Sequence, residues 1–314
     1  MAPWVYAMLD STVAILFGLM LWHAARRGSR PVLELLTAAL FGILLEWSDI
    51  MLFKTYSYST GFYLNIGPVP ICIGLCWAML IYSAMLYSDQ LGLPAAVAPF
   101  ADALWAIMLD LSFDAVAIRM GFWTWTIPMS DGYFGVPAAN FHAWLYVALG
   151  FSVWTRWVRG RRRGQIGLQL LSPLAAFALL LGGIYWLDAI KALLYPPSTR
   201  DQGMLVFVLT VAVFAGIVIA AIWRRGLAPR LGVDVIPTLT RWLMHGYFAL
   251  WLLAWTLAPQ LLPAGMDAPP FLLWVAVALI GLELALLVPI LPWPALRARH
   301  WQRVLRVQPV LRKE

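Results

Sequence analysis

The chain has 314 residues, of which 62% are hydrophobic and only 12% are charged. Its mean hydropathy of +0.79 is higher than soluble domains show, so the composition excludes an ordinary water-soluble enzyme. We expect an all-α fold, in the form of a polytopic membrane helical bundle.

Apolar segments of about 20 residues, the length needed to cross a bilayer as a helix, recur along the chain. We expect nine transmembrane helices, at residues 4–24, 31–53, 66–87, 95–117, 137–158, 166–194, 203–223, 237–258 and 270–292. Proline, glycine and charged residues punctuate the connections, and no connection is long enough to hold a soluble domain. Residues 1–314 are therefore expected to form a single integral-membrane domain, which ends in a basic tail at 293–314.

The basic residues predict the orientation of this bundle. With the N-terminus outside, the 22 Lys and Arg residues fall in cytoplasmic loops and the tail, apart from Lys54, Arg119, Lys191 and Arg200. We therefore expect the N-terminus outside and the C-terminus in the cytoplasm, in a multi-pass protein of a bacterial inner or cell membrane. This placement explains the net charge of +7 without a nucleic-acid partner and favours anionic lipids as partners of the cytoplasmic face.

Two pairs of carboxylates lie within the expected spans. Glu46 and Asp49 are spaced i, i+3, and Asp110 and Asp114 are spaced i, i+4, so each pair occupies one face of a helix. The predicted topology places all four in the outer half of the membrane. An ionisable side chain in hydrocarbon is costly unless it is paired, hydrated or neutral, so two pairs predict an acidic pocket. A purely structural role, with hydrogen bonds across helices, is the alternative.

These residue types favour acid–base chemistry on an apolar substrate. Burial and a like-charged neighbour both favour the protonated form of a carboxyl group, which can then deliver its proton to an alkene. Aromatic faces stabilise the resulting carbocation, and a second, ionised carboxylate can activate water or accept a proton to re-form an alkene. The segment FWTWTIPMSDGYF at residues 122–134 supplies such faces, although an interfacial aromatic belt would have the same composition.

Other chemistry has weaker support. Asp110 and Asp114 have the DxxxD spacing that holds Mg²⁺ on a diphosphate in membrane prenyltransferases, but the Asn-Asp start and the third aspartate of those enzymes are missing. We predict no metal and no cofactor. His142 follows Asn140 in the same polar layer, and the two cysteines are expected to be small core residues.

Between Asp110 and Trp144 the chain resembles the integral-membrane carotenoid biosynthesis family that includes the carotenoid 1′,2′-hydratases. The segments LDLSFDAVAIRMGFWTW and GYFGVPAANFHAW are similar to that family's aspartate-containing helix, its Gly-x-Trp-x-Trp turn, and its Tyr-Phe-Gly-Val-Pro and Asn-Phe-x-x-Trp segments. The matching positions are Asp114, Gly121, Trp123, Trp125, Tyr133, Phe134, Gly135, Val136, Pro137, Asn140, Phe141 and Trp144. The segment VPICIGLCWAM at 69–79 resembles the family's Val-Pro…Trp-x-Met helix, and Glu46 resembles the acidic residue that precedes it.

The resemblance covers about residues 40–150, whereas the helical half at 160–292 adds no motif. Two departures bear on the pocket: Ala115 stands where the family often has proline, and His142 with Ala143 replaces a more usual glycine-containing pair. The resemblance implies addition of water across the terminal double bond of an acyclic carotenoid end, which gives a tertiary alcohol without a redox cofactor. Its substrate would be a lipophilic polyene or isoprenoid within the bilayer.

On this interpretation Asp114 or Asp110 donates the proton, and Glu46 or Asp49 orients or deprotonates water. The expected substrate-binding residues, of which Asn140 and Tyr133 would position the water, are Trp77, Trp123, Trp125, Tyr133, Phe134, Asn140, His142 and Trp144. A proton-initiated terpene or carotenoid cyclase would use the same acid and aromatic residues with water excluded. Alternatives of other classes are a proton-coupled transporter with a carboxylate relay, and a scaffold protein.

Overall fold

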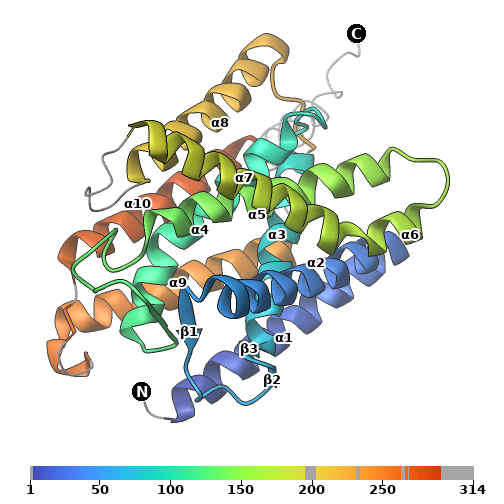
Figure 1. Cartoon of the computed structure of the whole chain (residues 1–314). Helices are drawn as coiled ribbons and strands as arrows, with labels where there is room; N and C mark the ends of the chain where they lie inside the picture. Colours follow the sequence, from blue (N-terminus) through green and yellow to red (C-terminus); the bar gives the residue numbers. More distant parts are fainter. Residues whose placement is uncertain (1–2, 195–202, 231–233, 263–265, 268, 291–314) are drawn as a thin grey trace, which may run out of the picture.

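The computed structural model describes residues 3–194, 203–230, 234–262, 266–267 and 269–290, and these form a helical bundle (Figure 1). The described helices are α1 (Pro3–Arg27), α2 (Ser29–Ser48), α3 (Ile71–Gln90), α4 (Ala98–Arg119), α5 (Ala138–Arg159), α6 (Gln165–Leu170), α7 (Ser172–Leu194), α8 (Met204–Arg225), α9 (Val235–Leu257) and α10 (Pro270–Leu287). A π-helical turn, Asp49–Phe53, continues α2, and short 3₁₀ turns follow α9 at Pro259–Leu261 and α10 at Val288–Ile290. The expected helical architecture is confirmed.

The long helices lie within a few residues of the expected segments, with one difference. The segment expected at 166–194 is divided into α6 and α7, which are separated at Leu171. By length and composition, six helices in the described ranges could cross a membrane, namely α1, α2 with its π turn, α3, α7, α8 and α10. The count of nine spans and the outside location of the N-terminus stay predictions, and the basic tail at 293–314 lies outside the described residues.

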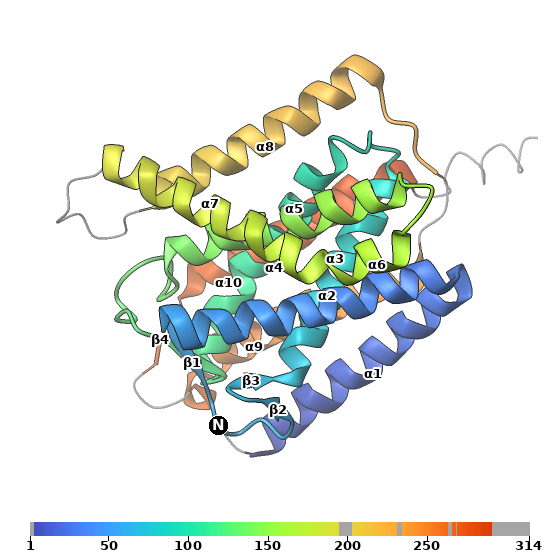
Figure 2. The ribbon, with the colours of Figure 1, turned by 45° about the vertical axis from the view of Figure 1, so that its right-hand side comes forward.

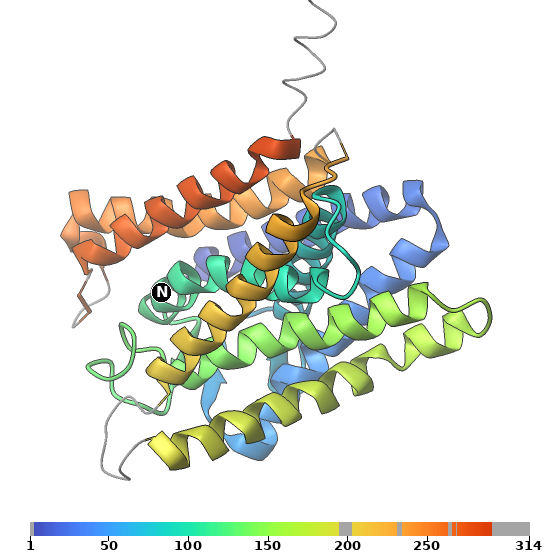
Figure 3. The same cartoon turned by 90° about the horizontal axis from the view of Figure 1, so that it is seen from above.

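Burial separates central from peripheral helices. Within their most apolar stretches, 83% of the α3 residues are buried but only 17% of the α8 residues. Figure 2 shows α8 along one edge of the bundle, and Figure 3 shows α9 and α10 side by side at another edge. An apolar helix with so much exposed surface suits a lipid environment, whereas α3 and α4 are suited to carry buried functional groups.

Two small antiparallel sheets, absent from the all-α prediction, cap the bundle. β1 (Tyr56–Tyr58) pairs with β4 (Trp123–Trp125), with Tyr56 opposite Trp125 and Tyr58 opposite Trp123. The second sheet joins β2 (Asn65–Ile66) to β3 (Val69–Pro70). Because alternate residues of a strand point to the same side, the two tyrosines and the two tryptophans share one face of the first sheet.

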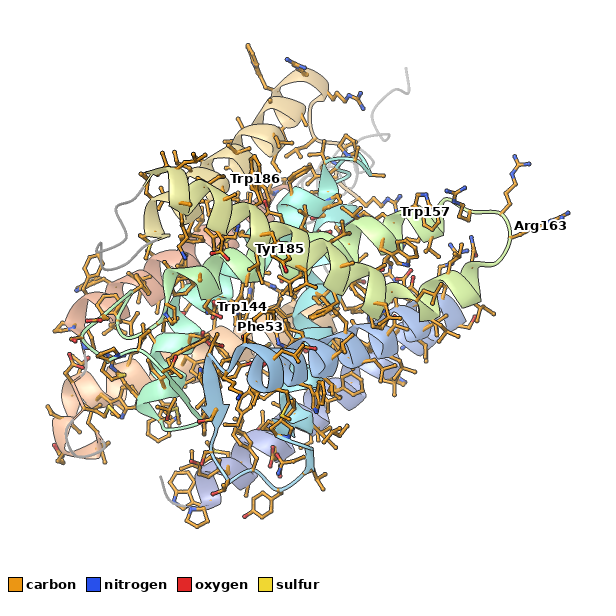
Figure 4. All side chains as sticks on the ribbon, in the orientation of Figure 1. Phe53, Trp144, Trp157, Arg163, Tyr185 and Trp186 are labelled. Carbon is orange, nitrogen blue, oxygen red and sulfur yellow. The ribbon has the colours of Figure 1, made fainter. Side chains whose placement is uncertain are left out.

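Ion pairs tie four helices together at the ends opposite these strands. Arg156 on α5 pairs with Asp102 on α4 at 3.0 Å and also with Asp89 on α3, while Arg159 pairs with Glu34 on α2 at 2.6 Å. The α5–α6 loop at this end carries Arg163, which projects away from the bundle and from the Trp144 region (Figure 4). The polar residues of the two helix ends therefore form separate layers, with the candidate carboxylates near the strands.

Candidate functional site

A cavity of about 70 Å³ lies beneath the β1–β4 sheet. Its polar lining residues are Glu46, Asp49, Tyr56, Tyr58, Asp114 and Asn140. Its aromatic walls are Trp77, Phe113, Trp123, Trp125 and Trp144. The remaining lining residues are Leu45, Ile73, Cys76, Leu80, Leu109, Ala143, Val147 and Met244. A cavity of this size and composition suits the end of a hydrocarbon chain with a few polar groups around it.

Three of the four expected carboxylates line this cavity. Glu46 and Asp49 come from the end of α2 and its π turn, and Asp114 comes from the last turns of α4. Asp110 does not line the cavity but lies behind Asp114, fully buried. π-Helical turns occur often at functional sites, and this one carries Asp49 itself.

Glu46 is held by three neutral donors. The hydroxyl groups of Tyr56 and Tyr58 donate to Oε2, the second at 2.5 Å, and Nε1 of Trp77 donates to Oε1 at 2.6 Å. Three hydrogen bonds donated to one carboxyl group favour its ionised form. Burial, followed by the charge of Glu46, raises the pKa of Tyr56 and of Tyr58 well above the usual range, so both keep the protons that they donate.

Asp110 and Asp114 both accept a hydrogen bond from the amide of Asn140. Nδ2 of Asn140 lies 2.6 Å from Oδ2 of Asp114 and 3.1 Å from Oδ2 of Asp110. Both carboxyl groups are buried, since Asp114 is 3% exposed and Asp110 is 0% exposed. The described residues that line the cavity include no Lys or Arg. Two adjacent buried carboxylates without a cation cannot both ionise at low cost, so this pair holds a proton.

Asp49 has a different environment from the other three carboxylates. It is half-buried at the cavity edge and accepts a hydrogen bond from Oγ1 of Thr55 at 2.8 Å. Its backbone carbonyl accepts the N–H of Lys54, whose left-handed conformation (φ 55°) ends the π turn. Since one of its oxygen atoms has no hydrogen bond within the described residues and the side chain is partly exposed, Asp49 is the carboxylate most accessible to water.

Aromatic rings enclose the space between these carboxylates. The rings of Trp77 and Trp144 lie 4.3 Å apart, and those of Phe113 and Trp123 lie 5.7 Å apart. Aromatic faces attract cations through their quadrupole, and a desolvated contact is worth about 2 kcal/mol. The walls can therefore stabilise a carbocation that forms next to Asp114.

The described lining residues of the cavity do not include three of the expected substrate-binding residues, and the role of those three stays a prediction. His142 directs Nε2 toward the carbonyl of Gly183 on α7, at 3.3 Å, and its ring packs on Tyr146. The cavity-facing residues of α5, Asn140, Ala143, Trp144 and Val147, follow the helical repeat, and a residue two positions after Asn140 falls on another face.

Tyr133 and Phe134 line a separate surface depression together with Arg119 and Asp267. Arg119 donates from Nη1 to the carbonyl of Phe134 at 2.9 Å, which holds this loop against α4. Burial, followed by the charge of Asp110, raises the pKa of Tyr133 to about 12. Tyr133 therefore lies close enough to Asp110 to sense its charge, but it lines the surface depression and is not among the described lining residues of the cavity.

Tyr56 and Tyr58 are the site residues that the sequence did not indicate. The sequence feature that could have indicated them is the alternation in YSY directly after an expected span, because such alternation is typical of a strand with one buried face. Cys76, expected in the core, lines the cavity as a free thiol, and Cys72 is buried nearby. Among the described residues, no group of three or more His, Cys, Asp and Glu side chains has an arrangement that could hold a metal ion.

Comparison with known proteins gives one result. The family model for carotenoid biosynthesis protein matches residues 4–196, more than half of the chain. No curated protein and no solved structure matches the chain. The matched segment contains all four candidate carboxylates and every aromatic residue of the cavity wall.

Proposed function

The chain belongs to the carotenoid biosynthesis protein family, and from this premise we propose that it is a membrane enzyme that adds water to the terminal double bond of an acyclic carotenoid end. One observation carries the proposal. A buried carboxyl pair without a neighbouring cation, Asp110 with Asp114, lies at the same aromatic-walled cavity as Glu46, a carboxyl group with hydrogen-bond donors on both oxygen atoms. Acid, anion and cation-stabilising surfaces are the parts that alkene hydration needs.

The first step is assigned to Asp114, the member of the pair that lines the cavity. Its carboxyl proton is transferred to the less substituted alkene carbon, where the π electrons form the new C–H bond. The positive charge then lies on the tertiary carbon, and Asp114 is left as a carboxylate. Asn140 holds Asp114 in place, and the like charge of Asp110 favours a shared proton on the pair before this step.

The carbocation that the first step forms must be stabilised. Glu46 contributes a negative charge in a fixed position, because its three donors favour the ionised form and hold the carboxylate in one orientation. The rings of Trp77 and Trp144 contribute faces on the same side of the cavity. Groups that are already oriented need no rearrangement as the charge develops, which is the main source of electrostatic catalysis.

The last step is water capture, which we assign to Asp49. Its half-buried carboxylate accepts one proton from water while the water oxygen bonds to the tertiary carbon, and the product is a tertiary alcohol. The proton gained by Asp49 equals the proton lost by Asp114, so the reaction consumes one water and no cofactor. Return of the proton through cavity water restores the starting state.

The location of the substrate supports a membrane site. A long polyene is costly to move into water, and the apolar helices around the cavity allow it to remain in the bilayer. We propose a multi-pass protein with nine crossings and the N-terminus outside, so that the carboxylates lie in the outer half of the bilayer. Anionic lipids are the proposed partners of the basic cytoplasmic face.

A proton-initiated cyclase is the second candidate. The feature that favours it is the cavity wall, which is mostly aromatic and aliphatic and would protect a cation from water until a second double bond attacks it. The two reactions differ in product mass, because hydration adds one water whereas cyclisation leaves the mass unchanged.

Expression in a lycopene-producing bacterial host, with pigments analysed by mass, tests the proposal. We expect a product heavier than lycopene by one water, and its loss in Asp114→Asn. Asp188→Asn is the matched control, because Asp188 is an exposed carboxylate on α7 paired with Lys191. A pigment of unchanged mass but altered retention would support the cyclase, and unaltered lycopene with membrane-inserted protein would overturn both.

A further inference from the structure

One cavity residue comes from outside the segment that the family match covers. Among the described lining residues, all lie within 4–196 except Met244 on α9. Met244 is 8% exposed and therefore buried in the bundle. The matched segment thus supplies the carboxylates and aromatic walls, and the second half of the chain adds a single flexible side chain to the cavity.

Met244 belongs to the end of the cavity that is remote from the strands. Leu80, Leu109 and Val147, the other lining residues at this end, lie near the middle of α3, α4 and α5, whereas the polar residues lie near the helix ends. On α5 alone, Asn140 and Val147 are seven residues apart, which is about 10 Å along the axis. An alkene end that enters with its double bond beside Asp114 can place its terminal methyl groups at this apolar floor.

Buried contacts fix the position of α9 on both sides of Met244. Three residues before it, Arg241 pairs with Glu283 on α10 at 2.7 Å and donates to the carbonyl of Trp105 on α4 at 2.8 Å. Four residues after it, Phe248 packs edge-to-face on Phe113, with ring centroids 4.3 Å apart. Residues spaced by three and four share one helix face, so these contacts hold the Met244 face against the cavity.

We propose that Met244 is a specificity-determining residue that sets the size of the alkene end group accepted by the cavity. The inference rests on the proposed function. Methionine is unbranched and adaptable, so its side chain fills the floor when an end group is small and limits the space when it is large. A shorter side chain should enlarge the floor, and a bulkier one should shorten the cavity.

The test compares lycopene with a synthetic analogue whose terminal methyl groups are replaced by ethyl groups. The quantity measured is the ratio of the two kcat/KM values in membranes that contain the wild-type protein, Met244→Ala or Met244→Phe. One methylene in an apolar pocket is worth about tenfold or more, so we expect Met244→Ala to shift the ratio toward the ethyl analogue about tenfold and Met244→Phe to shift it the other way. A ratio is insensitive to the amount of folded protein.

Leu243→Ala is the matched control, because Leu243 is the neighbouring residue on α9 and 45% exposed. Its ratio should equal that of the wild-type protein. Polyene binding, measured by quenching of tryptophan fluorescence with the same two compounds, extends the test to a protein that gives no hydrated product. Turnover to hydrated product with an unchanged ratio in both Met244 variants overturns the inference alone. No hydrated product, with binding ratios that shift as expected, overturns the proposed hydration and supports the role of Met244.

Discussion

Nδ2 of Asn140 on α5 lies 2.6 Å from Oδ2 of Asp114 on α4, and it is also within hydrogen-bonding distance of Asp110. The amide therefore joins two carboxyl groups of one helix to a second helix. Asp110 Oδ1 has no hydrogen-bond partner within the described residues, so this pair depends heavily on the amide. Asn140 thereby determines where the acid points and which oxygen atoms remain free to hold the proton.

Replacement of Asn140 by leucine should lower kcat with little change in KM. The variant keeps a side chain of similar length but removes the donor, and loss of a hydrogen bond to a charged group costs about 1.5–3 kcal/mol, equivalent to about a tenfold to hundredfold loss of rate. Hydration of lycopene in isolated membranes is the measurement. Asn65→Leu serves as the control, since Asn65 is exposed on β2. An Asn140→Leu rate equal to wild type would show that the amide does not orient the acid.

The two tyrosines that donate to Glu46 give a prediction about pH. Because burial raises the pKa of Tyr56 and Tyr58 well above the usual value, both remain protonated in the folded protein near pH 10, where an unperturbed tyrosine ionises. The tyrosinate absorbance of the folded wild-type protein and of the Tyr56→Phe/Tyr58→Phe variant should therefore be equal at pH 10–11. In the denatured proteins the variant should show two tyrosinates fewer.

The raised pKa of Tyr56 and Tyr58 also makes the stability of the protein depend on pH. Because the pKa is higher in the folded state than in the unfolded state, the unfolded chain loses these two protons first. The contribution of the two tyrosines to the free energy of unfolding is therefore fully present below about pH 10 and declines as the pH rises through the folded-state pKa. Thermal unfolding temperatures should fall more steeply above pH 10 in the wild-type protein than in the double phenylalanine variant. Equal slopes would indicate that the two hydroxyl groups are not protected.

Gly42 on α2 is expected to control the third donor to Glu46. A Cβ atom at this position would lie 2.6 Å from Cβ of Trp77, so Gly42→Ala must displace the indole that donates to Glu46. We expect about a tenfold loss of hydration rate and a destabilisation of about 1–3 kcal/mol. Gly18→Ala on α1, where the added Cβ meets no atom within 4 Å, should leave the rate unchanged and raise stability slightly. Similar behaviour of the two variants would contradict this role of Gly42.

The part of the site that could be predicted from the sequence rests on helical periodicity. The spacing of Glu46 with Asp49, and of Asp110 with Asp114, places each pair on one face whatever the tertiary structure is. The pairing of Tyr58 with Trp123 could not be read in this way, because it joins segments far apart in the chain and depends on how the helices pack. Short strands between spans carry too few residues for a periodic signal.

The direction in which His142 points is a second feature that the sequence does not determine. Its position next to the polar residue Asn140 suggested a common layer, and the layer is indeed similar in depth. Two positions along a helix correspond to about 200° of rotation, however, so depth in the membrane and direction around the helix are independent properties. The direction is determined by which helices pack on α5, and α7 covers the face that carries His142.

Arg241 and Glu283 provide the last prediction, which concerns stability. Both side chains are fully or almost fully buried, and His245 also contacts Glu283 at 3.1 Å. Glu283→Gln leaves the Arg241 charge buried without its counter-ion, which should destabilise the protein by about 3–5 kcal/mol. The double variant Arg241→Met/Glu283→Leu removes both charges and should recover much of that loss. Thermal unfolding in detergent measures both effects. Asp188→Asn is the control, because it removes an exposed ion pair and should destabilise the protein by less than about 1 kcal/mol. If the double variant is as unstable as the single one, hydrogen bonding to Trp105, and not charge pairing, fixes α9.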